Sequence, residues 1–600
     1  MRMHSMAFFF QIAKFQSNSN SGNKNGLYGK GAKKKLHVDS LVIMEVQHIP
    51  DSFESVHQYL GTYLFPLLEE TRAELSLSLK AIHKAPFARL VSIEEPKSGG
   101  KLLLDVSVDS WRNTTKNGGK ESYRTLPGDI FLILDEKPNA ETVMSLQCST
   151  RTWAFAWAKQ NPENGYSAHL KLNFSKNISG EHDMQKEFFI VFLMSITTNL
   201  RIWNSLHSSE DAKIIEHGDE ICDRCSLYNN AVCAEKLGTS LSSVLNDSQS
   251  AAVLCSICKT LCDHMPSVEL IWGPPGTGKT KTISFLLCKI LEMNQRVLAC
   301  APTNVAITEL AARVVQLLRE SSKAKGVLCS LGDMLLFGNK DRLKVGSELE
   351  EIYLDYRVDR LVECFGQAGW KYHTTCFINL FESSNSEYLI LLKSNVQTSP
   401  SFLGFIREKF KSTSSALRGC LKTLITHIPK QFILEHNIQN IEILLNLIDS
   451  FGMLLSQDNV TSEQMKMLLS SPEVFIDFPN SSVAETILYF RSQCLSSLRT
   501  LQASLNQLQF PSTANRESVK KFCFQRASLI LCTASSSFQL NFMKMDPVNL
   551  LVIDEAAQLK ECESIVPLQL PGIKHAILIG DECQLPAIVS SQVSSMDYLL

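Results

Sequence analysis

A run of eight residues rich in glycine carries the clearest chemistry in this 600-residue sequence. Residues 273–280 read GPPGTGKT, the pattern G-x-x-x-x-G-K-T. Its glycines let a backbone wind closely around a phosphate, with successive N–H groups pointing inward. Lys279 could reach the β- and γ-phosphates of a nucleotide, and the Thr280 hydroxyl could ligate Mg²⁺. The predicted nucleotide-binding residues are Gly273, Pro274, Pro275, Gly276, Thr277, Gly278, Lys279 and Thr280.

The residues on either side of this loop have the periodicities of a strand and a helix. The apolar run 270–272 before the loop is typical of a short buried strand. After the loop, apolar residues recur at the spacing of one helical face: Ile283, Leu286, Leu287, Ile290 and Leu291. The N-terminal end of such a helix would face the phosphates with its positive dipole. The alternative, a glycine turn without a nucleotide, does not explain this context.

Two adjacent carboxylates follow a second buried strand. Asp554 and Glu555 come directly after the apolar run Leu550–Ile553. Asp554 is suited to hold Mg²⁺ opposite Thr280, and Glu555 could polarise an attacking water. The competing interpretation is a solvated turn, which the buried strand and the upstream phosphate loop make weaker.

Two glutamines could complete the site. Gln584 lies beyond the apolar run His575–Ile579, and its amide could hydrogen-bond the γ-phosphate or the attacking water. Gln249 precedes the phosphate loop by about two dozen residues, and by itself it would be an ordinary surface residue.

Five apolar runs separated by helical patterns predict an open parallel α/β sheet. The runs are 268–272, 296–301, 528–533, 550–554 and 575–579. Each chemical motif stands at the carboxyl end of one of them, which is where such sheets bind ligands. The predicted sheet is therefore formed by residues 245–335 and 516–600, with a mostly helical insertion over 336–515.

The first part of the chain has a different organisation. We predict a leader over 1–43, either disordered or carrying an organelle or nuclear signal, since its first 38 residues hold lysines but no acidic residue. A stalk helix is expected over 44–85 and further stalk helices over 196–244. Between them, residues 86–195 alternate with period two and are punctuated by turns such as Asn117-Gly-Gly119, which predicts a small β-barrel or sandwich.

Several aromatic residues of this barrel segment could stack on bases but more often form a core. They are Trp111, Tyr123, Trp153, Trp157 and Tyr166. Two cysteine clusters could suggest zinc, and both lack the full ligand spacing. The first is Cys222, Cys225 and Cys233; the second is Cys255, Cys258, Cys262 and His264, whose cysteines we expect to face a helical core.

Composition limits the remaining classes of function. The net charge of −2 gives no overall basic field, so nucleic-acid binding would need a local groove. The 18 cysteines show no disulfide framework, as in intracellular proteins. We find no apolar run of membrane-spanning length; the best, Phe188–Ile196, fits a strand.

Taken together, the motifs resemble those of superfamily 1 helicases. Gln249, GPPGTGKT, APTNVAI (301–307), DEAAQ (554–558) and GDECQLPA (580–587) are similar to motifs Q, I, Ia, II and III of that superfamily. DEAAQ with GDECQLPA resembles the senataxin-type branch, which is related to the nonsense-mediated-decay helicase. The resemblance spans roughly residues 50 to 600.

The resemblance implies a RecA-like P-loop NTPase fold with a stalk, a barrel and a helical insertion. It implies that ATP and Mg²⁺ are the cofactors and that Gln249 recognises adenine. It also implies that single-stranded RNA or DNA lies on a groove lined by Pro302, Thr303, Asn304, Thr533 and Ser535, and that the protein is nuclear, although a cytoplasmic location stays open.

A second RecA-like domain, which such helicases place after motif III, is absent from the sequence up to Leu600. That domain would supply arginine fingers, which accelerate nucleotide hydrolysis by ~10³–10⁵-fold in related enzymes. Two hypotheses follow: a helicase present only in part, or a half-motor that binds ATP and RNA without unwinding. A kinase or switch protein that shares only the phosphate loop would not explain GDECQLPA.

Overall fold

The structure is a computed structural model that describes most of the chain in segments. These are residues 48–94, 103–112, 123–139, 142, 152–158, 169–175, 187–208, 214, 244–262, 264–325, 329–393, 400–470, 482–511 and 515–591. The predicted leader, the first cysteine cluster, the Asn117–Gly119 turn and Tyr166 lie outside the described residues.

Two helices, rather than one, form the first part of the stalk. They are α2 (Val56–Thr62) and α3 (Leu64–Lys80), and the Ser55 hydroxyl caps α2 by accepting a hydrogen bond from the Gln58 N–H at 3.2 Å. The short helix η2 (Ile82–Lys84) follows, so α3 ends before Pro86. Helix α5 (Thr197–Leu206) returns the chain to the stalk after the barrel.

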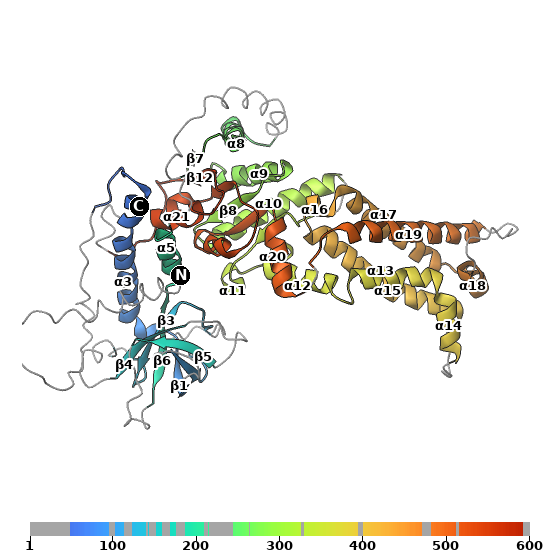
Figure 1. Cartoon of the computed structure of the whole chain (residues 1–600), viewed down its shortest axis with the longest axis horizontal. Helices are drawn as coiled ribbons and strands as arrows, with labels where there is room; N and C mark the ends of the chain where they lie inside the picture. Colours follow the sequence, from blue (N-terminus) through green and yellow to red (C-terminus); the bar gives the residue numbers. More distant parts are fainter. Residues whose placement is uncertain are drawn as a thin grey trace, which may run out of the picture.

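Six antiparallel strands form a closed barrel beside the stalk (Figure 1). They are β1 (Phe87–Glu94), β2 (Leu103–Val108), β3 (Asp129–Leu134), β4 (Trp153–Ala158), β5 (His169–Phe174) and β6 (Phe189–Ser195), in the order β1-β2-β5-β4-β3-β6. Pairing of β1 with β6 closes the barrel, so the strands leave no free edge. Trp111 and Tyr123 lie edge to face at 4.6 Å and pack against the barrel's inner core, which supports the core interpretation of these aromatics.

The nucleotide motifs lie on a parallel sheet, as predicted. Its order is β7-β12-β11-β8-β10-β9, with every pair parallel. The strands are β7 (Ser267–Trp272), β8 (Val297–Ala301), β9 (Met334–Leu336), β10 (Leu529–Thr533), β11 (Leu550–Ile553) and β12 (His575–Gly580). The sixth strand, β9, was not among the five predicted. The strand β7 is an edge strand, and its Leu270 and Trp272 side chains are exposed.

Helices cover both faces of this sheet. One face packs on α8 (Asp247–Thr260), α9 (Lys279–Glu292) and α10 (Asn304–Lys325). The other carries α20 (Arg516–Arg526), η4 (Ala534–Phe542) and η5 (Ala556–Gln558), while α21 (Glu561–Leu568) packs on η4 and on the stalk helix α5. We call the sheet with these helices the motor.

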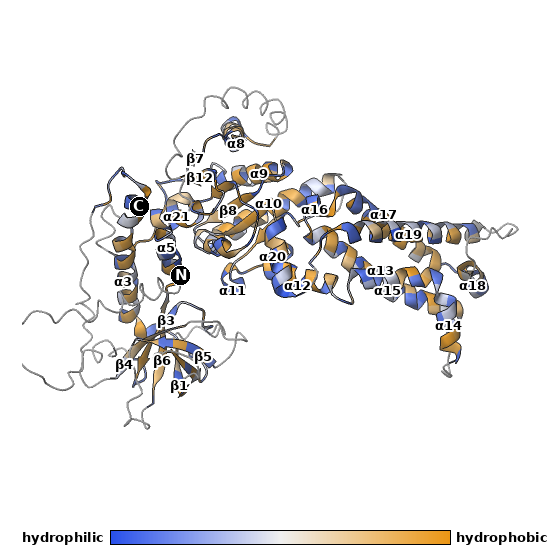
Figure 2. Ribbon diagram, in the orientation of Figure 1, coloured by the Kyte–Doolittle hydropathy of each residue, from blue (hydrophilic) through white to orange (hydrophobic). Residues whose placement is uncertain are grey.

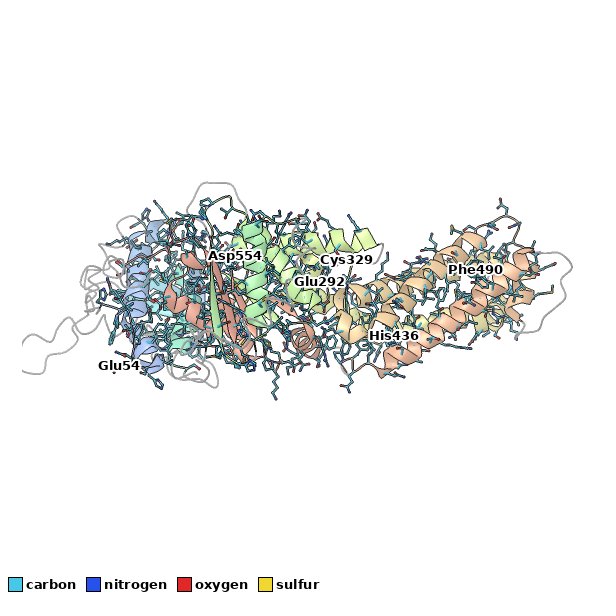
Figure 3. All side chains as sticks on the ribbon, turned by 90° about the horizontal axis from the view of Figure 1, so that it is seen from above. Glu54, Glu292, Cys329, His436, Phe490 and Asp554 are labelled. Carbon is cyan, nitrogen blue, oxygen red and sulfur yellow. The ribbon has the colours of Figure 1, made fainter. Side chains whose placement is uncertain are left out.

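The helical insertion projects from the motor as an elongated arm (Figure 1). It begins with α11 (Lys340–Leu343) and η3 (Glu350–Ile352), which lie on the motor. The arm itself consists of α12 (Leu354–Phe365), α13 (Trp370–Glu382), α14 (Ser384–Lys393), α15 (Phe402–His427), α16 (Lys430–Ile433), α17 (Glu435–Leu455), α18 (Ser462–Ser470) and α19 (Ser482–Gln507). Figure 3 shows His436 and Phe490 along the arm and Asp554 within the motor.

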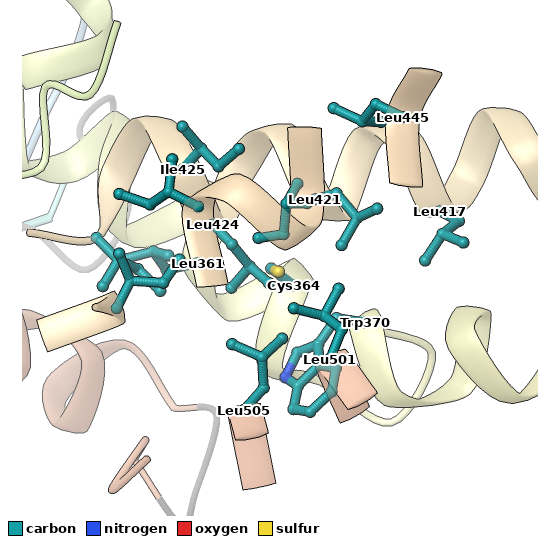
Figure 4. Close-up of a cluster of buried hydrophobic side chains, with 14 of the residues drawn as sticks. Leu361, Cys364, Trp370, Leu417, Leu421, Leu424, Ile425, Leu445, Leu501 and Leu505 are labelled. Carbon is teal, nitrogen blue, oxygen red and sulfur yellow. The ribbon is translucent and has the colours of Figure 1, made fainter. Parts of the chain in front are cut away.

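One apolar core runs through the arm. Leu361, Leu421 and Leu505 come from three different helices and meet within it (Figure 4). The long arm helices alternate between hydrophobic and hydrophilic residues along the ribbon (Figure 2), as expected for helices with one face in a core. In the described residues one helix, α17, is long and apolar enough to cross a membrane by length and composition alone, which the sequence pattern did not reveal. Its buried face, with Ile441, Leu444 and Ile448, belongs to the arm core.

The buried Arg357 fixes the root of the arm. Its guanidinium donates hydrogen bonds to the carbonyls of Leu331 at 2.8 Å, Gly332 at 3.0 Å and Glu351 at 3.2 Å. These carbonyls belong to the segments before β9 and before α12. A single side chain therefore joins the first arm helix to the motor sheet.

Candidate functional site

The phosphate loop connects the edge strand β7 to the N-terminus of α9. Gly276 and Gly278 have φ of 79° and 82°, a left-handed conformation that other residues adopt only with strain. No side chain caps α9, whose N-cap residue is Gly278. The first N–H groups of the helix are consequently left for an anion, together with the positive end of its dipole.

Lys279 folds back onto the loop. Its ammonium donates a hydrogen bond to the Gly273 carbonyl at 2.7 Å, so the charge lies where the loop would surround a phosphate. The neighbouring Thr280 hydroxyl makes no hydrogen bond to any described residue. Lys279 therefore makes one hydrogen bond within the loop, whereas the Thr280 hydroxyl makes none among the described residues.

Gln249 contacts the loop directly. Its amide nitrogen donates to the Thr277 carbonyl at 2.8 Å, and its amide oxygen accepts from the Asn246 N–H at 3.2 Å as part of a capping box at the start of α8. A Cβ at Gly278 would come within 2.8 Å of this amide. A cavity of about 250 Å³ lies between α8, β7 and the loop, and it is lined by Gln249, Trp272, Lys279 and apolar side chains of α9.

Asp554 is buried at the carboxyl end of β11. Its N–H donates to the Cys300 carbonyl at 2.9 Å, which ties it to the end of β8. Burial, with a further contribution from the charge of Glu555, raises the pKa of Asp554 to about 6, and Lys279 partly opposes this shift. A carboxylate destabilised in this way is stabilised by a nearby cation.

Glu555 adopts an uncommon backbone conformation next to it. Its φ is 52°, in the left-handed region, its N–H donates to the Asp554 carboxylate at 3.0 Å, and its own carboxylate accepts from Gln558 at 3.1 Å. A left-handed backbone conformation at a residue other than glycine persists only where the surrounding structure enforces it, and such residues are frequent at functional sites. The conformation of Glu555 is therefore consistent with a place in the site.

Gln584 is bonded within its own turn. Its amide donates to the Asp581 carboxylate at 2.7 Å, and the Trp272 indole N–H reaches the other oxygen of that carboxylate at 3.3 Å. The turn after β12 is thereby linked to the end of β7, where the phosphate loop begins. Contact between Gln584 and a γ-phosphate would require the amide to leave Asp581, so the predicted role stays a prediction.

The predicted groove residues lie at the ends of β8 and β10. Thr303 caps α10 by accepting from the Ala306 N–H at 3.1 Å, with Pro302 before it and Asn304 after it. The Thr533 hydroxyl donates to Ser536 at 2.9 Å. Ser535 is buried, and its hydroxyl donates to Thr198 and accepts from Arg201, both on α5. Pro302, Thr303, Asn304 and Thr533 are exposed or partly exposed, whereas the buried Ser535 bonds to the stalk helix α5.

The fit to Mg²⁺ rests on the donor set. The Thr280 hydroxyl and the Asp554 carboxylate are oxygen donors of the kind that Mg²⁺ prefers, and few protein ligands suffice because phosphates and water complete its shell. No cluster of three or more His, Cys, Asp or Glu residues suited to a metal occurs among the described residues.

The second cysteine cluster differs from its prediction. Cys258 and Cys262 are buried, but Cys255 is exposed, with its thiol 3.6 Å from the Glu269 carboxylate. Helix α8 covers an edge strand and ends at Thr260, so one side of it faces solvent and Cys262 lies beyond it.

A buried contact that sequence patterns did not indicate joins the motor to the stalk. The Glu70 carboxylate on α3 accepts from Lys560 at 2.8 Å, from the Ser590 N–H at 2.7 Å and from the Ser591 N–H at 2.9 Å. Lys560 follows DEAAQ and Ser590 follows GDECQLPA. The two motif segments therefore share one carboxylate of the stalk. The only sequence feature that could have indicated this contact is the presence of acidic residues on an otherwise apolar helix face.

Comparison with known proteins identifies two matching families. The model of a family described as "AAA domain" matches residues 244–592, and that of a domain of unknown function matches residues 33–225. Probable helicase senataxin of Homo sapiens is 34% identical over 134 residues, which are 19% of this chain and 5% of that protein.

Two further relatives extend the comparison. Helicase sen1 of Schizosaccharomyces pombe is 22% identical over 385 residues, 59% of this chain and 17% of its own length. Regulator of nonsense transcripts 1 of Dictyostelium discoideum is 39% identical over 93 residues, 14% of this chain and 6% of its own length. The predicted resemblance to the senataxin-type branch is confirmed, and the chain spans only a small part of these relatives.

Proposed function

This chain belongs to the AAA domain family, and on that premise we propose that it is the ATP-binding motor of a superfamily 1 helicase that acts on single-stranded nucleic acid. The observation that carries the proposal is the meeting of the loops after β7, β11 and β12 at one sheet edge, with Gln249 bonded to the phosphate loop. Parallel sheets bind ligands at this edge.

In this proposal the chain's own groups hold ATP and prepare the water. Gln249 recognises adenine, the N–H groups at the start of α9 bind the phosphates, and Lys279 leaves the Gly273 carbonyl for the γ-phosphate. Thr280 and Asp554 would hold Mg²⁺, which when bound neutralises charge on the phosphate oxygens. Glu555 orients and deprotonates the attacking water.

The nucleic acid would lie along the ends of β8 and β10. Helix N-termini, hydroxyls and amides bind phosphates without reading sequence, which suits a translocating motor. This path is supported by four residues at those ends: Pro302, Thr303, Asn304 and Thr533. The name of one relative, a regulator of nonsense transcripts, favours RNA as the strand. We expect the protein to act in the nucleus.

The alternative is a half-motor that binds ATP and RNA without unwinding. Both hypotheses predict binding, and they differ in turnover. Closure of a second domain on ATP brings the arginine fingers that accelerate hydrolysis by ~10³–10⁵.

The test measures MgATP binding with a fluorescent ATP analogue and ATP hydrolysis with and without single-stranded RNA. We expect binding with negligible hydrolysis by this chain, and RNA-stimulated turnover once a second RecA-like domain is appended. Glu555→Gln should keep binding, and Lys289→Ala serves as a control for the loss of a positive charge on α9, because Lys289 pairs with Glu292 at the other end of that helix.

Failure of nucleotide binding by the unaltered chain would overturn the proposal. RNA-stimulated turnover by this chain alone would instead show that a second domain is dispensable. An extended chain that binds RNA but never hydrolyses ATP would favour the half-motor.

A further inference from the structure

A contact region between the stalk and the motor places Arg201 against two serine hydroxyls, and the positive charge of Arg342 acts on it. We call it the arginine recess and define it by Arg201 on α5, Arg342 on α11, and Ser535 and Ser536 after β10. Helices α5 and α11 lie on the side of the motor that faces the barrel (Figure 1). The recess lies at the carboxyl end of β10, beside Thr533.

Arg201 is partly buried and bonds only neutral groups. One guanidinium nitrogen lies 3.2 Å from the Ser535 hydroxyl and 3.5 Å from the Ser536 hydroxyl. Within the described part of the chain, Arg201 forms no ion pair. An arginine withdrawn from water is ordinarily paired with an anion, because its desolvation is otherwise uncompensated.

Arg342 increases the local positive charge. Burial lowers the pKa of Arg201, and the like charge of Arg342 lowers it further. Arg342 is exposed and makes no ion pair with any described residue. Its neighbour Asp341 is engaged elsewhere, with Arg124 of the barrel at 2.6 Å.

The buried Asp129 carboxylate, which Arg342 influences, is hydrogen-bonded to other groups. Asp129, at the start of β3, accepts hydrogen bonds from the Tyr123 hydroxyl and from the Leu126 N–H at 2.8 Å. Burial raises the pKa of Asp129, and its hydrogen bonds and the charge of Arg342 oppose the shift. The recess thus combines two guanidinium groups and two hydroxyls, and a bound anion would relieve their repulsion.

We propose that the arginine recess binds a phosphodiester group of the single-stranded nucleic acid, so that the stalk forms part of the strand's path. This inference rests on the proposed function and adds Arg201 and Arg342 to the residues predicted there. Arginine suits this ligand because its planar guanidinium donates two parallel hydrogen bonds to phosphate oxygens. Such contacts position a strand without selecting its sequence.

The experiment measures fluorescence anisotropy of labelled oligonucleotides about 12 nucleotides long, one of uridine and one of thymidine. The full chain is compared with Arg201→Ala, Arg201→Lys, Arg342→Ala and the double alanine variant at roughly 50–300 mM KCl. The matched control is Arg360→Ala, because Arg360 is an exposed arginine on α12 that pairs with Glu363. Thermal melting and fluorescent MgATP binding are recorded for every variant.

We expect each alanine variant to weaken binding about fivefold and to reduce the slope of log K against log salt by about 0.7 per lost contact. Both oligonucleotides should lose affinity equally, since the contact is to phosphate. Arg201→Lys, which keeps the charge, should retain part of the affinity, and ATP binding should not change.

Three results would overturn the inference. The first is that the unaltered chain binds the oligonucleotides and that Arg342→Ala, Arg201→Lys and the double alanine variant bind with the same affinity and the same salt slope. The proposed function would then stand without the inference. The second is a loss confined to one sugar type, which would mean that the contact is not to phosphate. If the unaltered chain binds neither oligonucleotide, the nucleic-acid part of the proposed function fails together with the inference.

Discussion

The motor sheet and the arm both have continuous apolar cores, but their polar residues are used differently. In the arm, buried polar side chains donate to backbone carbonyls four residues earlier in the chain: Thr374 to Trp370, Ser384 to Leu380 and Asn437 to Ile433. At the motor edge, Lys279 bonds only a carbonyl of its own loop, and Thr280 has no partner among the described residues.

This difference distinguishes polar groups that are bonded within the fold from polar groups that are available to bind a ligand. A side chain whose donor is already bonded to a nearby backbone carbonyl has no free donor for a ligand. A side chain held at a sheet edge without such bonding keeps its donors and acceptors for a substrate. Substitutions in the two regions should therefore have separable effects, on folding in one case and on binding in the other.

The largest effect is expected for Lys279→Ala in the motor. Loss of its charge at the phosphate loop should weaken MgATP binding at least ~10³-fold, about 4 kcal/mol. The melting temperature should change little, because Lys279 makes one hydrogen bond to its own loop. Titration with a fluorescent ATP analogue measures the loss, and an affinity within threefold of the unaltered chain would contradict the role.

The converse substitution is Leu421→Ala in the arm core. Leu421 is fully buried in α15, and the cavity left behind should reduce the free energy of unfolding by about 3 kcal/mol. Denaturant unfolding measures this change. Nucleotide affinity should stay the same, and a loss of affinity would show that the arm and the phosphate loop are coupled.

A pH-dependent effect is expected in α21, between the motor and the stalk. Burial raises the pKa of Glu563 to about 7; Lys560 opposes the shift and Glu74 adds to it. Because the folded state holds this proton more tightly, the contribution of Glu563 to stability should be full below about pH 4.5 and should be lost as the pH rises through about 7.

Glu563→Gln removes this titration. It should stabilise the protein by about 2 kcal/mol at pH 8 and by much less at pH 5. Denaturant unfolding at the two pH values checks the prediction. An equal gain at both would show that Glu563 is ionised throughout.

The smallest effect is expected for Cys255→Ser on α8. This thiol is exposed and outside the core, so stability should change by less than about 0.5 kcal/mol. Metal analysis should find the same zinc content in the unaltered chain and in Cys255→Ser. Zinc lost on substitution would restore the metal interpretation of the cluster.

Much of the motor could be predicted from sequence because its chemistry requires particular residues at particular spacings. Five of six strands, the loops after them and the barrel agree with the patterns. The strand β9 was missed because its three residues are too short for a period to be visible. The Gln584–Asp581 bond and the exposure of Cys255 depend on local turn geometry and on which strand lies at the edge.

Contacts between distant segments were beyond prediction. Glu69 and Glu70 stand on a largely apolar helix face, where the sequence gives no hint of Ser590 or Lys560 as partners. The arginine recess likewise depends on the barrel, the stalk and the insertion meeting at one place. Local patterns predict elements, whereas such sites require the tertiary arrangement.

The Glu70 contact also constrains when the protein can complete its fold during synthesis. Glu70 and Ser591 are separated by 521 positions, and a ribosome adds roughly 5–20 residues per second. For roughly half a minute to two minutes the stalk carboxylates must therefore remain hydrated, while the barrel, whose strands end at Ser195, can already close. The Glu70 contact between the stalk and the motor can form only after residues 590 and 591 have been synthesised.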